Sequence, residues 1–273
     1  MRHIAFYGKG GIGKSTIVSN LAILLARQGR KVLLVGCDPK HDSSYKVSDI
    51  YPIPTVMEQV VAKRRDLSSD DYLFEGRDGL TCVESGGPDP GMGCAGRGIT
   101  KMFEIFEAGG IFRRDYDYCL YDVLGDVVCG GFAVPMRYAR DTAVVIVVSG
   151  EIMSLYAGNN ISRAIVRLSR SGVRLGGLVG NLRGLADEES RIRAFAQRIG
   201  GDVLEIVPQD PLVNEAERQR RTVIEHAPDS SIAAKYRSLC EAVSGLKVED
   251  LPVPRPMGEL GFDEFIRNVP DEE

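Results

Sequence analysis

A glycine-rich loop that carries a lysine and a serine at fixed spacing lies near the start of the chain. The run Gly8-Lys9-Gly10-Gly11-Ile12-Gly13-Lys14-Ser15 matches G-x-x-x-x-G-K-[ST] and stands between a strand pattern and a helix pattern. Glycines let backbone N–H groups turn inward around phosphate oxygens, and the start of a helix adds its positive dipole end. In such a loop Lys14 neutralises the β- and γ-phosphates, and the Ser15 hydroxyl binds Mg²⁺. The pattern in this setting predicts a nucleotide site rather than a glycine turn without a ligand.

Lys9 is an additional feature of the phosphate loop. A second lysine early in the loop is typical of a class of ATPases that work as dimers, in which it reaches across the interface to the partner's nucleotide. The alternative is a solvated surface lysine, and the residues alone leave both open.

Acidic residues follow two of the predicted strands. Asp38, with Lys40 and Asp42 close behind it, follows the second strand, and the run Asp122-Val123-Leu124-Gly125-Asp126 follows a later one. Both sets fall at the carboxyl edge of the predicted sheet, where a nucleotide lies. There a carboxylate can hold Mg²⁺ through water or orient the attacking water, and the glycine of D-x-x-G can bond the γ-phosphate. An isolated aspartate after a strand is most often a cap or turn residue, but the phosphate loop favours the functional role.

Two of the six cysteines stand in glycine-rich surroundings. Cys94 lies in the run Glu84–Gly98 and Cys129 in the run Asp126–Phe132. Glycines allow close backbone approach and N–H···S bonds, which an iron–sulfur cluster site needs. A [4Fe–4S] cluster takes four thiolates, so a two-fold dimer would have to supply the other two. Spacing alone favours two buried structural cysteines, because a separation of 35 residues is not a metal-binding signature.

Short apolar runs alternate with longer helical patterns along the chain. Continuous apolar runs without alternation are typical of a parallel sheet covered on both faces, and their alternation with helices predicts an open, doubly wound α/β sheet. The expected strands are His3–Tyr7, Lys31–Gly36, Leu80–Val83, Asp117–Asp122, Ala143–Ser149, Leu175–Asn181 and Val203–Val207. The expected helices are Gly13–Gln28, Ile152–Ser169, Glu188–Ile199, Pro211–Arg221 and Ile232–Val243.

Length and composition agree with one α/β domain. The 273 residues are 44% hydrophobic, as is usual for a globular protein. Their formal net charge of -4 argues against a nucleic-acid binder that relies on a phosphate-seeking surface. Apolar runs are too short to cross a bilayer, and the first residues lack a signal-peptide pattern, so we expect a cytoplasmic protein. The other cysteines fit a reduced apolar core rather than a disulfide framework. We expect one domain over residues 1–250 and a Pro-rich C-terminal extension over 251–273 that lies as an arm on the surface.

The motifs together resemble the nitrogenase iron protein family. The matching segments occur in order up to about Glu225, and they are GKGGIGKS, GCDPKHDS, VESGGPDPGMGCAGRG, YDVLGDVVCGGFA and the TVIE segment. The resemblance implies a P-loop ATPase fold and a homodimer bridged by one [4Fe–4S] cluster, with MgATP bound by each subunit. It also implies single-electron transfer to a larger nitrogenase-like metalloenzyme, with a low-potential ferredoxin or flavodoxin as the electron donor, and no nucleic-acid or membrane partner.

The resemblance also implies roles for individual residues. Cys94 and Cys129 match the cluster ligands, and Arg97 matches an exposed arginine of the docking face. The nucleotide and Mg²⁺ loop is matched by Gly8, Lys9, Gly10, Gly11, Ile12, Gly13, Lys14, Ser15 and Thr16. The first switch is matched by Asp38, Lys40 and Asp42, with Asp38 placed to activate water, and the second by Asp122, Gly125 and Asp126. Asn181 and Asp210 match positions that contact the adenine base. Because only four residues separate Gly125 from Cys129, a γ-phosphate-dependent shift could move a cluster ligand directly.

Several positions depart from the pattern of nitrogen-fixing members. These are Ile17-Val18-Ser19, the segment His41–Tyr45, Gly180, Gln209 and Asn214, and the acidic tail is shortened. The departures spare the ATPase and cluster residues and bear on the catalytic partner. They favour methylthio-alkane reductase, which reduces a carbon–sulfur bond. Nitrogenase, protochlorophyllide or chlorophyllide reductase and the reductive cyclase of coenzyme F430 synthesis are the alternatives.

Two other classes of protein share the loop that contains Lys9. A chromosome-partitioning or septum-positioning switch ATPase needs neither Cys94 nor Cys129, and it usually carries a basic or amphipathic segment that this sequence does not show. A metal-cluster insertion ATPase could bind a cluster between subunits but would hand it on rather than cycle electrons.

Overall fold

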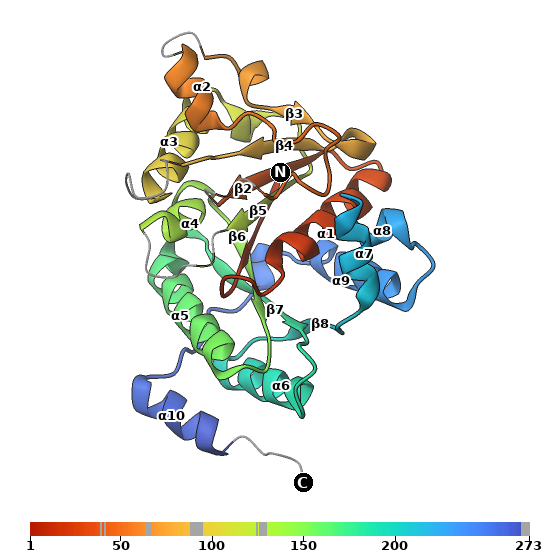
Figure 1. Cartoon of the computed structure of the whole chain (residues 1–273). Coiled ribbons are helices and arrows are strands. Elements are labelled where there is room, and N and C mark those ends of the chain that lie inside the picture. The colour runs from red at the N-terminus through yellow and green to blue at the C-terminus, as the bar shows by residue number, and fades with distance from the viewer. Residues whose placement is uncertain are drawn as a thin grey trace.

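One mixed sheet forms the centre of the molecule. The structure, a computed structural model, describes residues 1–38, 40, 42–63, 67–87, 95–123, 125 and 130–268. Within these residues eight strands follow the order β3-β4-β2-β5-β1-β6-β7-β8 (Figure 1), and all are parallel except β3, which pairs antiparallel with β4. Their bounds are β1 Arg2–Tyr7, β2 Val32–Cys37, β3 Phe74–Glu75, β4 Thr81–Glu84, β5 Tyr118–Val123, β6 Thr142–Val148, β7 Arg174–Asn181 and β8 Val203–Val207. The doubly wound parallel sheet predicted from the sequence is confirmed.

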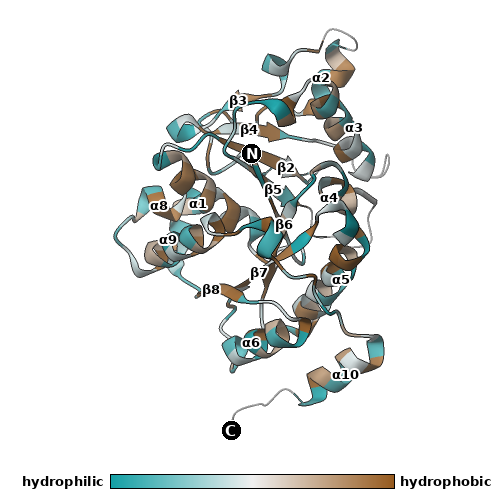
Figure 2. Cartoon of the chain, turned by 180° about the vertical axis from the view of Figure 1, so that it is seen from behind, coloured by the Kyte–Doolittle hydropathy of each residue, from teal (hydrophilic) through white to brown (hydrophobic). Residues whose placement is uncertain are grey.

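Helices cover both faces of this sheet (Figures 1 and 2). One layer contains α1, α7, α8 and α9, and the other contains α3, α4, α5 and α6. The helices are α1 Lys14–Arg27, α2 Val56–Lys63, α3 Ala95–Ala108, α4 Val134–Tyr138, α5 Ile152–Leu168, α6 Glu188–Ile199, α7 Pro211–Arg218, α8 Val223–His226, α9 Ser231–Ser244 and α10 Glu259–Asn268. The five helices and seven parallel strands predicted from the sequence all occur, with ends displaced by at most three residues. The sequence patterns predict none of α2, α3, α4, α8, α10 and β3.

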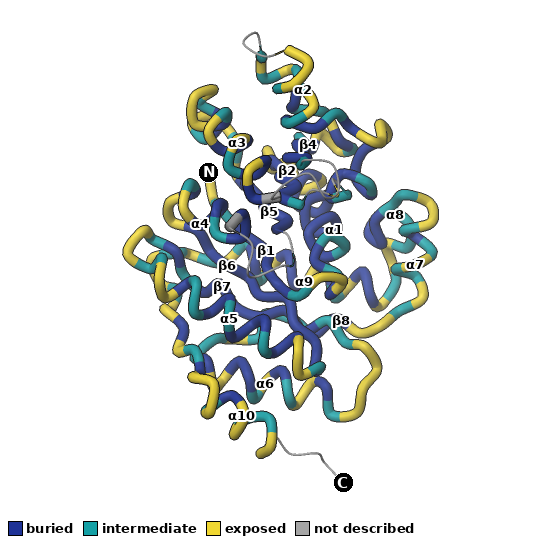
Figure 3. Tube along the Cα trace, turned by 60° about the vertical axis from the view of Figure 1, so that its left-hand side comes forward, coloured by how far each residue is buried: buried dark blue, intermediate teal, exposed yellow. Residues whose placement is uncertain are grey.

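The central strands are apolar along their length because they face a core on both sides. β2, β5 and β6 are buried at every position, and the central strands form the dark interior of Figure 3. On one face, aromatic side chains of α3 pack over β5, with the Phe103 and Tyr121 ring centroids 5.7 Å apart. On the other face α1 is buried along most of its length against α9 and the sheet. Two-sided burial holds the strand ends, and the loops that follow them, in fixed positions.

The described part of the C-terminal arm, residues 251–268, packs on the rest of the chain and ends in a helix that the sequence patterns do not predict. Its extended part donates from the Arg255 nitrogen to the Ile199 carbonyl at 2.7 Å. The buried Asn159 side chain pairs with the Met257 backbone in both directions, since its Nδ2 donates to the carbonyl at 2.9 Å and its Oδ1 accepts from the nitrogen at 2.8 Å. The arm then continues into α10, where Phe262 packs edge-on against Tyr156.

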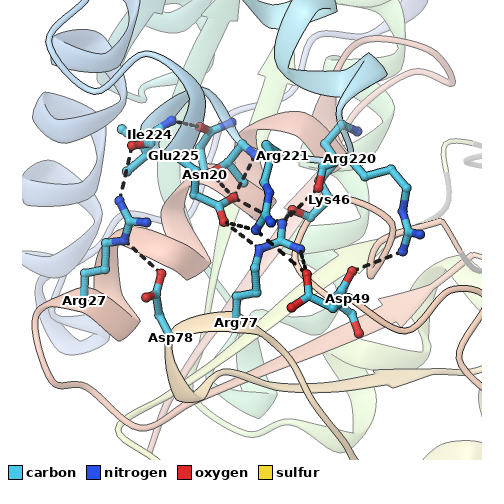
Figure 4. A network of polar contacts seen from close by, with 12 residues as sticks. Asn20, Arg27, Lys46, Asp49, Arg77, Asp78, Arg220, Arg221, Ile224 and Glu225 are labelled. Atoms are coloured by element: carbon cyan, nitrogen blue, oxygen red, sulfur yellow. Dashed lines mark hydrogen bonds and ion pairs between the residues drawn. The ribbon is translucent and has the colours of Figure 1, made fainter.

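A buried arginine joins three segments that are far apart in the sequence (Figure 4). The Arg77 side chain, 12% exposed, donates to Glu225 of α8 at 2.6 Å and to Asp49 at 3.0 Å. It also donates to the backbone carbonyls of Lys46 and Arg220. Burial acts to raise the pKa of Glu225, but hydrogen bonds from Arg77 and Thr222 outweigh it and lower that pKa. The TVIE segment is itself a capping box, in which the Glu225 carboxylate accepts from the nitrogen and hydroxyl of Thr222.

We expect Arg77→Met to destabilise the protein strongly. The substitution keeps much of the side-chain volume but removes the closest charged partner of the Glu225 carboxylate, which keeps only Arg221 at 3.3 Å. The carbonyls of Lys46 and Arg220 also lose this donor, and we expect the total loss to reach about 3 kcal/mol. Urea denaturation measures this loss of unfolding free energy. Arg193→Met is the control, because the Arg193–Glu189 pair lies on the surface of α6 and such pairs contribute about 0–1 kcal/mol. Equal losses in both variants would contradict a structural role for the Arg77 network.

Candidate functional site

A cleft of about 850 Å³ opens at the carboxyl edge of the sheet. The phosphate loop, the segments that follow β2, β5, β7 and β8, and α7 all contribute to it. Parallel strands end at one edge, so residues far apart in sequence meet there. Of the predicted site residues, the cleft is lined by Gly10, Gly11, Gly13, Lys14, Ser15, Thr16, Asp38, Lys40, Asp42, Asp122, Gly125, Asn181 and Asp210.

The phosphate loop adopts backbone conformations that require glycine. Gly11 and Gly13 have φ values of 74° and 96°, and Gly13 caps the start of α1. A Cβ atom on Gly13 would lie 2.4 Å from Nδ2 of Asn181, which donates to the Ile12 carbonyl at 2.7 Å. The end of β7 therefore holds the loop from the side. This arrangement leaves the first turn of α1 open toward the cleft, as a phosphate-binding loop needs.

Lys14 and Asp122 form the charged centre of the cleft. Both are nearly completely buried, and the Lys14 Nζ donates to the Lys9 carbonyl at 3.2 Å. Burial lowers the pKa of Lys14, and the charges of Asp122 and Asp38 oppose this. Burial raises the pKa of Asp122, against the charge of Lys14 and hydrogen bonds from Ser15 and Ser43. Each charge therefore compensates for the desolvation of the other, and added phosphates would compete with Asp122 for the lysine.

The segment after β2 brings the first predicted switch to the same cleft. Asp38 accepts a hydrogen bond from the Lys40 nitrogen at 3.0 Å, which fixes the turn that carries both side chains. Ser43 donates to Asp122 Oδ2 at 2.7 Å and so links this segment to the end of β5. Asp38, Lys40 and Asp42 all line the cleft, as the sequence predicts.

Gly125 lies directly against the phosphate loop. A Cβ atom on Gly125 would lie 2.4 Å from the Gly10 nitrogen and 2.5 Å from the Gly10 Cα. Any larger residue would push the two loops apart. Of the second predicted switch, Asp122 and Gly125 are therefore at the cleft, and Asp126 lies outside the described residues.

Three predicted residues of the phosphate loop do not line the cleft. Gly8 and Ile12 are buried behind the loop, where a Cβ atom on Gly8 would lie 2.3 Å from the Val147 carbonyl oxygen. They shape the loop from below. Lys9 is half-buried and is not among the residues that line the cleft of its own subunit.

The far end of the cleft is formed by the segment after β8 and by α7. Asp210 caps α7 by accepting from the Leu212 nitrogen at 2.8 Å, and Gln209 and Asn214 lie beside it. Sequence reasoning misses the buried Lys46, whose Nζ lies 2.6 Å from Glu217 Oε1 in the same cleft. It also misses Arg183 and Tyr236. No motif contains Lys46, its partner Glu217, Arg183 or Tyr236, because the fold alone brings them to this edge.

Cys94 and Cys129 lie outside the described residues, which resume at Ala95 and at Gly130. Gly96, at the start of α3, and Gly131, in the 3₁₀ turn Gly130–Ala133, touch: a Cβ atom on Gly131 would lie 2.5 Å from the Gly96 Cα. Each glycine follows one of the two cysteines by two positions. Because glycine has no side chain, the two backbones can come this close, as two segments that hold one cluster would have to. Arg97 is exposed on α3 in the same region.

The other four cysteines are buried free thiols, as predicted. Burial raises the pKa of Cys37 well above its usual range, and it raises the pKa of Cys119 to about 12 and that of Cys240 to about 11. These groups remain protonated and are poor metal ligands. In the described part of the chain, the thiols therefore belong to the apolar core.

Glu84 is a carboxyl group that sequence reasoning passes over. It ends β4, is fully buried, and accepts from the Ser44 nitrogen at 2.7 Å through Oε1. Burial raises its pKa from 4.5 to about 8, with the hydrogen bond from the Ser44 nitrogen opposing the shift. The same signal that identifies Asp38 and Asp122, an acidic residue at a strand end, could have found it.

The raised pKa predicts a pH-dependent effect of Glu84→Gln. Between pH 4.5 and 8 the unfolded state loses the Glu84 proton and the folded state keeps it, so wild-type stability falls as pH rises through this window. Glutamine has no proton to lose. From pH 5 to pH 8, the unfolding free energy of Glu84→Gln should therefore gain up to about 4 kcal/mol relative to wild type.

Urea denaturation at several pH values between 5 and 8 measures this change. Glu205→Gln is the control, because the pKa of Glu205 is lowered and its group is ionised in both states over that range. A difference for Glu84→Gln that does not vary with pH would show that the carboxyl group is ionised in the folded protein.

Comparison with known proteins agrees with this arrangement. The family described as 4Fe-4S iron sulfur cluster binding proteins, NifH/frxC family, matches residues 2–270. The chain is 48% identical over 261 residues to a nitrogenase iron protein of Methanospirillum hungatei, covering 94% of this chain and 92% of the relative. It is also 48% identical over 267 residues to nitrogenase iron protein 2 of Methanothermobacter thermautotrophicus, covering 98% of each.

Among solved structures, the cell division ATPase MinD of Pyrococcus furiosus is similar with a TM-score of 0.72 and 21% identity, over 90% of this chain and all of that one. A ParA family ATPase from Chlorobium tepidum has a TM-score of 0.67 and 17% identity, over 90% of this chain and 99% of its own. These likenesses establish the P-loop ATPase fold alone. Among the described helices, none is long and apolar enough to cross a membrane. The match over nearly the whole sequence shows that the chain belongs to the NifH/frxC family of 4Fe-4S iron–sulfur cluster binding proteins.

Proposed function

We propose that the protein is a homodimeric, ATP-dependent donor of single electrons to a larger nitrogenase-like metalloenzyme. Cys94 and Cys129 of both subunits would hold one [4Fe–4S] cluster on the two-fold axis. The observation that carries this proposal is the contact between Gly96 and Gly131, since it brings together the chain segments next to the two cysteines. The family match supports the same cluster.

The residues of this chain fit a cluster shared between subunits. When bound, the cluster supplies a metal centre that takes up and releases one electron. Cys94 has glycines before and after it, Gly93 and Gly96, and Cys129 is followed by Gly130 and Gly131, so backbone N–H groups could approach the sulfurs and tune that centre. A low-potential ferredoxin or flavodoxin would supply the electron.

In the cleft, the side chains would divide the work of ATP hydrolysis. Lys14 would neutralise phosphate charge, Ser15 would bind Mg²⁺, and Asp38 would orient the attacking water, with Asp122 and Asp42 near the metal. Lys9 does not line its own cleft, which supports a role at the nucleotide of the second subunit. Asn181 and Asp210 also line the cleft, which supports their role as contacts of the base.

Hydrolysis would reach the cluster through the second switch. Gly125 touches Gly10 of the phosphate loop, and Cys129 follows it by four residues. A γ-phosphate between these loops would have to displace Gly125, and the displacement would pass along the chain to Cys129. The position of the cluster would thereby depend on the bound nucleotide.

The larger component would dock on the face that carries Arg97. Its exposure at the start of α3, three residues after Cys94, supports this role. Among the known systems we favour methylthio-alkane reductase, on the departures at the segment His41–Tyr45 and at Gln209 and Asn214. Nitrogenase, the (proto)chlorophyllide reductases and the F430-type reductive cyclase are the alternatives, and electron delivery to each purified component distinguishes them.

Anaerobic purification tests the proposed function. We expect about four irons per dimer and, after dithionite reduction, an S = 1/2-type EPR signal that MgATP alters. Cys94→Ser and Cys129→Ser should each lose the iron, whereas Cys240→Ala should keep it because Cys240 belongs to the apolar core. An iron-free dimer that hydrolyses ATP after attempted reconstitution would instead identify a switch ATPase of the partitioning type.

Gly131→Ala tests the contact that carries the proposal. The added methyl group would meet the Gly96 Cα at 2.5 Å, so the two cysteine segments should separate and the iron content should fall although both cysteines are present. Gly258→Ala is the control, because no atom lies within 4 Å of the Cβ that it adds. Full iron content in Gly131→Ala, measured at equal folded fraction, would contradict this account of the site.

A further inference from the structure

Two adjacent serines connect the nucleotide cleft to a strand that does not line it. Ser43 donates to Asp122 at the end of β5, and the Ser44 nitrogen donates to Glu84 at the end of β4. β2 lies between these two strands in the sheet. The backbone at Ser43 and Ser44 therefore bridges three neighbouring strand ends.

Glu84 is confined on the side of β2. A Cβ atom on Gly36 would lie 1.8 Å from Glu84 Oε2, so the carboxyl group occupies the space that any other residue would fill. The next residue, Ser85, donates from its nitrogen to the Gly36 carbonyl at 2.9 Å. The carboxyl group and the backbone that follows it thus hold the same glycine of β2 between them.

β4 leads directly into the segment that contains Cys94. Gly86 has a φ of 65°, and a Cβ atom on Gly98 of α3 would lie 2.7 Å from the Gly86 carbonyl oxygen. The residues at both ends of the Cys94 segment are therefore packed together. Because these residues are closely packed, a displacement of Glu84 would displace them too.

Three buried oxygens around this junction have no hydrogen-bond partner among the described residues. They are Glu84 Oε2, Ser44 Oγ and Ser85 Oγ. Unpaired buried polar groups cost free energy, so a second arrangement in which they pair would be favoured once another interaction allows it. The junction can therefore respond when the neighbouring Ser43 and Asp122 move.

We propose that Glu84 is a positioning residue that couples the nucleotide-facing segment 42–47 to residues 85–87 and 95–99, which flank Cys94 in the sequence. This coupling rests on the proposed function and adds a second connection beside that from Gly125 to Cys129. A phosphate or Mg²⁺ that displaced Asp122 would also displace Ser43, which is hydrogen-bonded to it. The adjacent Ser44 would then shift Glu84 and residues 85–87. Both cluster ligands would then respond to one nucleotide, each through its own strand.

Hydrogen exchange measured by mass spectrometry on the full-length dimer tests the coupling, with and without MgATP. In the wild type, segments 42–51 and 85–99 should change exchange at the same MgATP concentration. Glu84→Met keeps the volume but removes the acceptor for Ser44, and it should reduce the nucleotide-dependent change at 85–99 about tenfold while 42–51 still responds. Glu84→Gln keeps an acceptor and should restore the response. Glu205→Met, the same change in β8, should leave it intact.

Each outcome decides the proposal. If hydrogen exchange of residues 85–99 in the wild type does not change with MgATP, the proposal is overturned. This test needs no variant, so it applies even if Glu84→Met fails to fold. An unchanged response at 85–99 in folded Glu84→Met would also overturn it. Iron content and EPR are read on the same samples, so loss of the coupling with an intact cluster in the variant supports the inference. A wild type without iron that still shows the coupling would remove the electron-donor function while keeping the role of Glu84.

Discussion

Gly125 lies so close to Gly10 that no side chain fits between the second switch and the phosphate loop. This close approach depends on β5 and β1 being neighbours, in a register that sets Asp122 beside Phe6. The same register places the Asp122 carboxylate next to Lys14, and each of these buried charges makes the burial of the other affordable. The apolar cores on both faces of the sheet hold β1 and β5 in place, and the glycines allow the loops that follow these strands to touch. A nucleotide phosphate therefore enters a cleft in which Lys14 and Asp122 already balance each other's charge.

Much of this site follows from local sequence. The phosphate loop is recognisable because its glycines have conformational reasons to occur at those positions, and Gly11 and Gly13 indeed adopt positive φ values. Asp38 and Asp122 are predictable because an acidic residue after a buried strand must emerge at the carboxyl edge. The central strands are predictable because burial on both faces requires an uninterrupted apolar run.

Other parts depend on tertiary contacts that no local pattern encodes. Lys46 enters the cleft because α7 places Glu217 opposite it, and Glu84 differs from an ordinary strand-end carboxylate only through its burial. Helix α3 shows the opposite case: Ile99, Met102, Phe103 and Phe106 repeat at helical spacing, but the glycines before them suggest a loop. At Gly180, a Cβ atom would lie 2.4 Å from Ile206 Cδ1 and 3.1 Å from Ile192 Cδ1, so the packing of these side chains requires a glycine here. That position therefore reports packing in β7 and α6 and carries little information on the catalytic partner.

The pairing of Asn159 with Met257 gives the C-terminal arm a meaning beyond surface cover. The side-chain amide of Asn159, buried in α5, pairs its oxygen and one of its two N–H donors with the backbone of Met257 in the arm. A chain shortened before residue 257 would expose that amide to an apolar gap, whereas a fusion or label attached beyond α10 would leave the pairing alone. The useful attachment point for a surface anchor or an electrode linker is therefore after Asn268, on the far side of a backbone contact that keeps the arm in place.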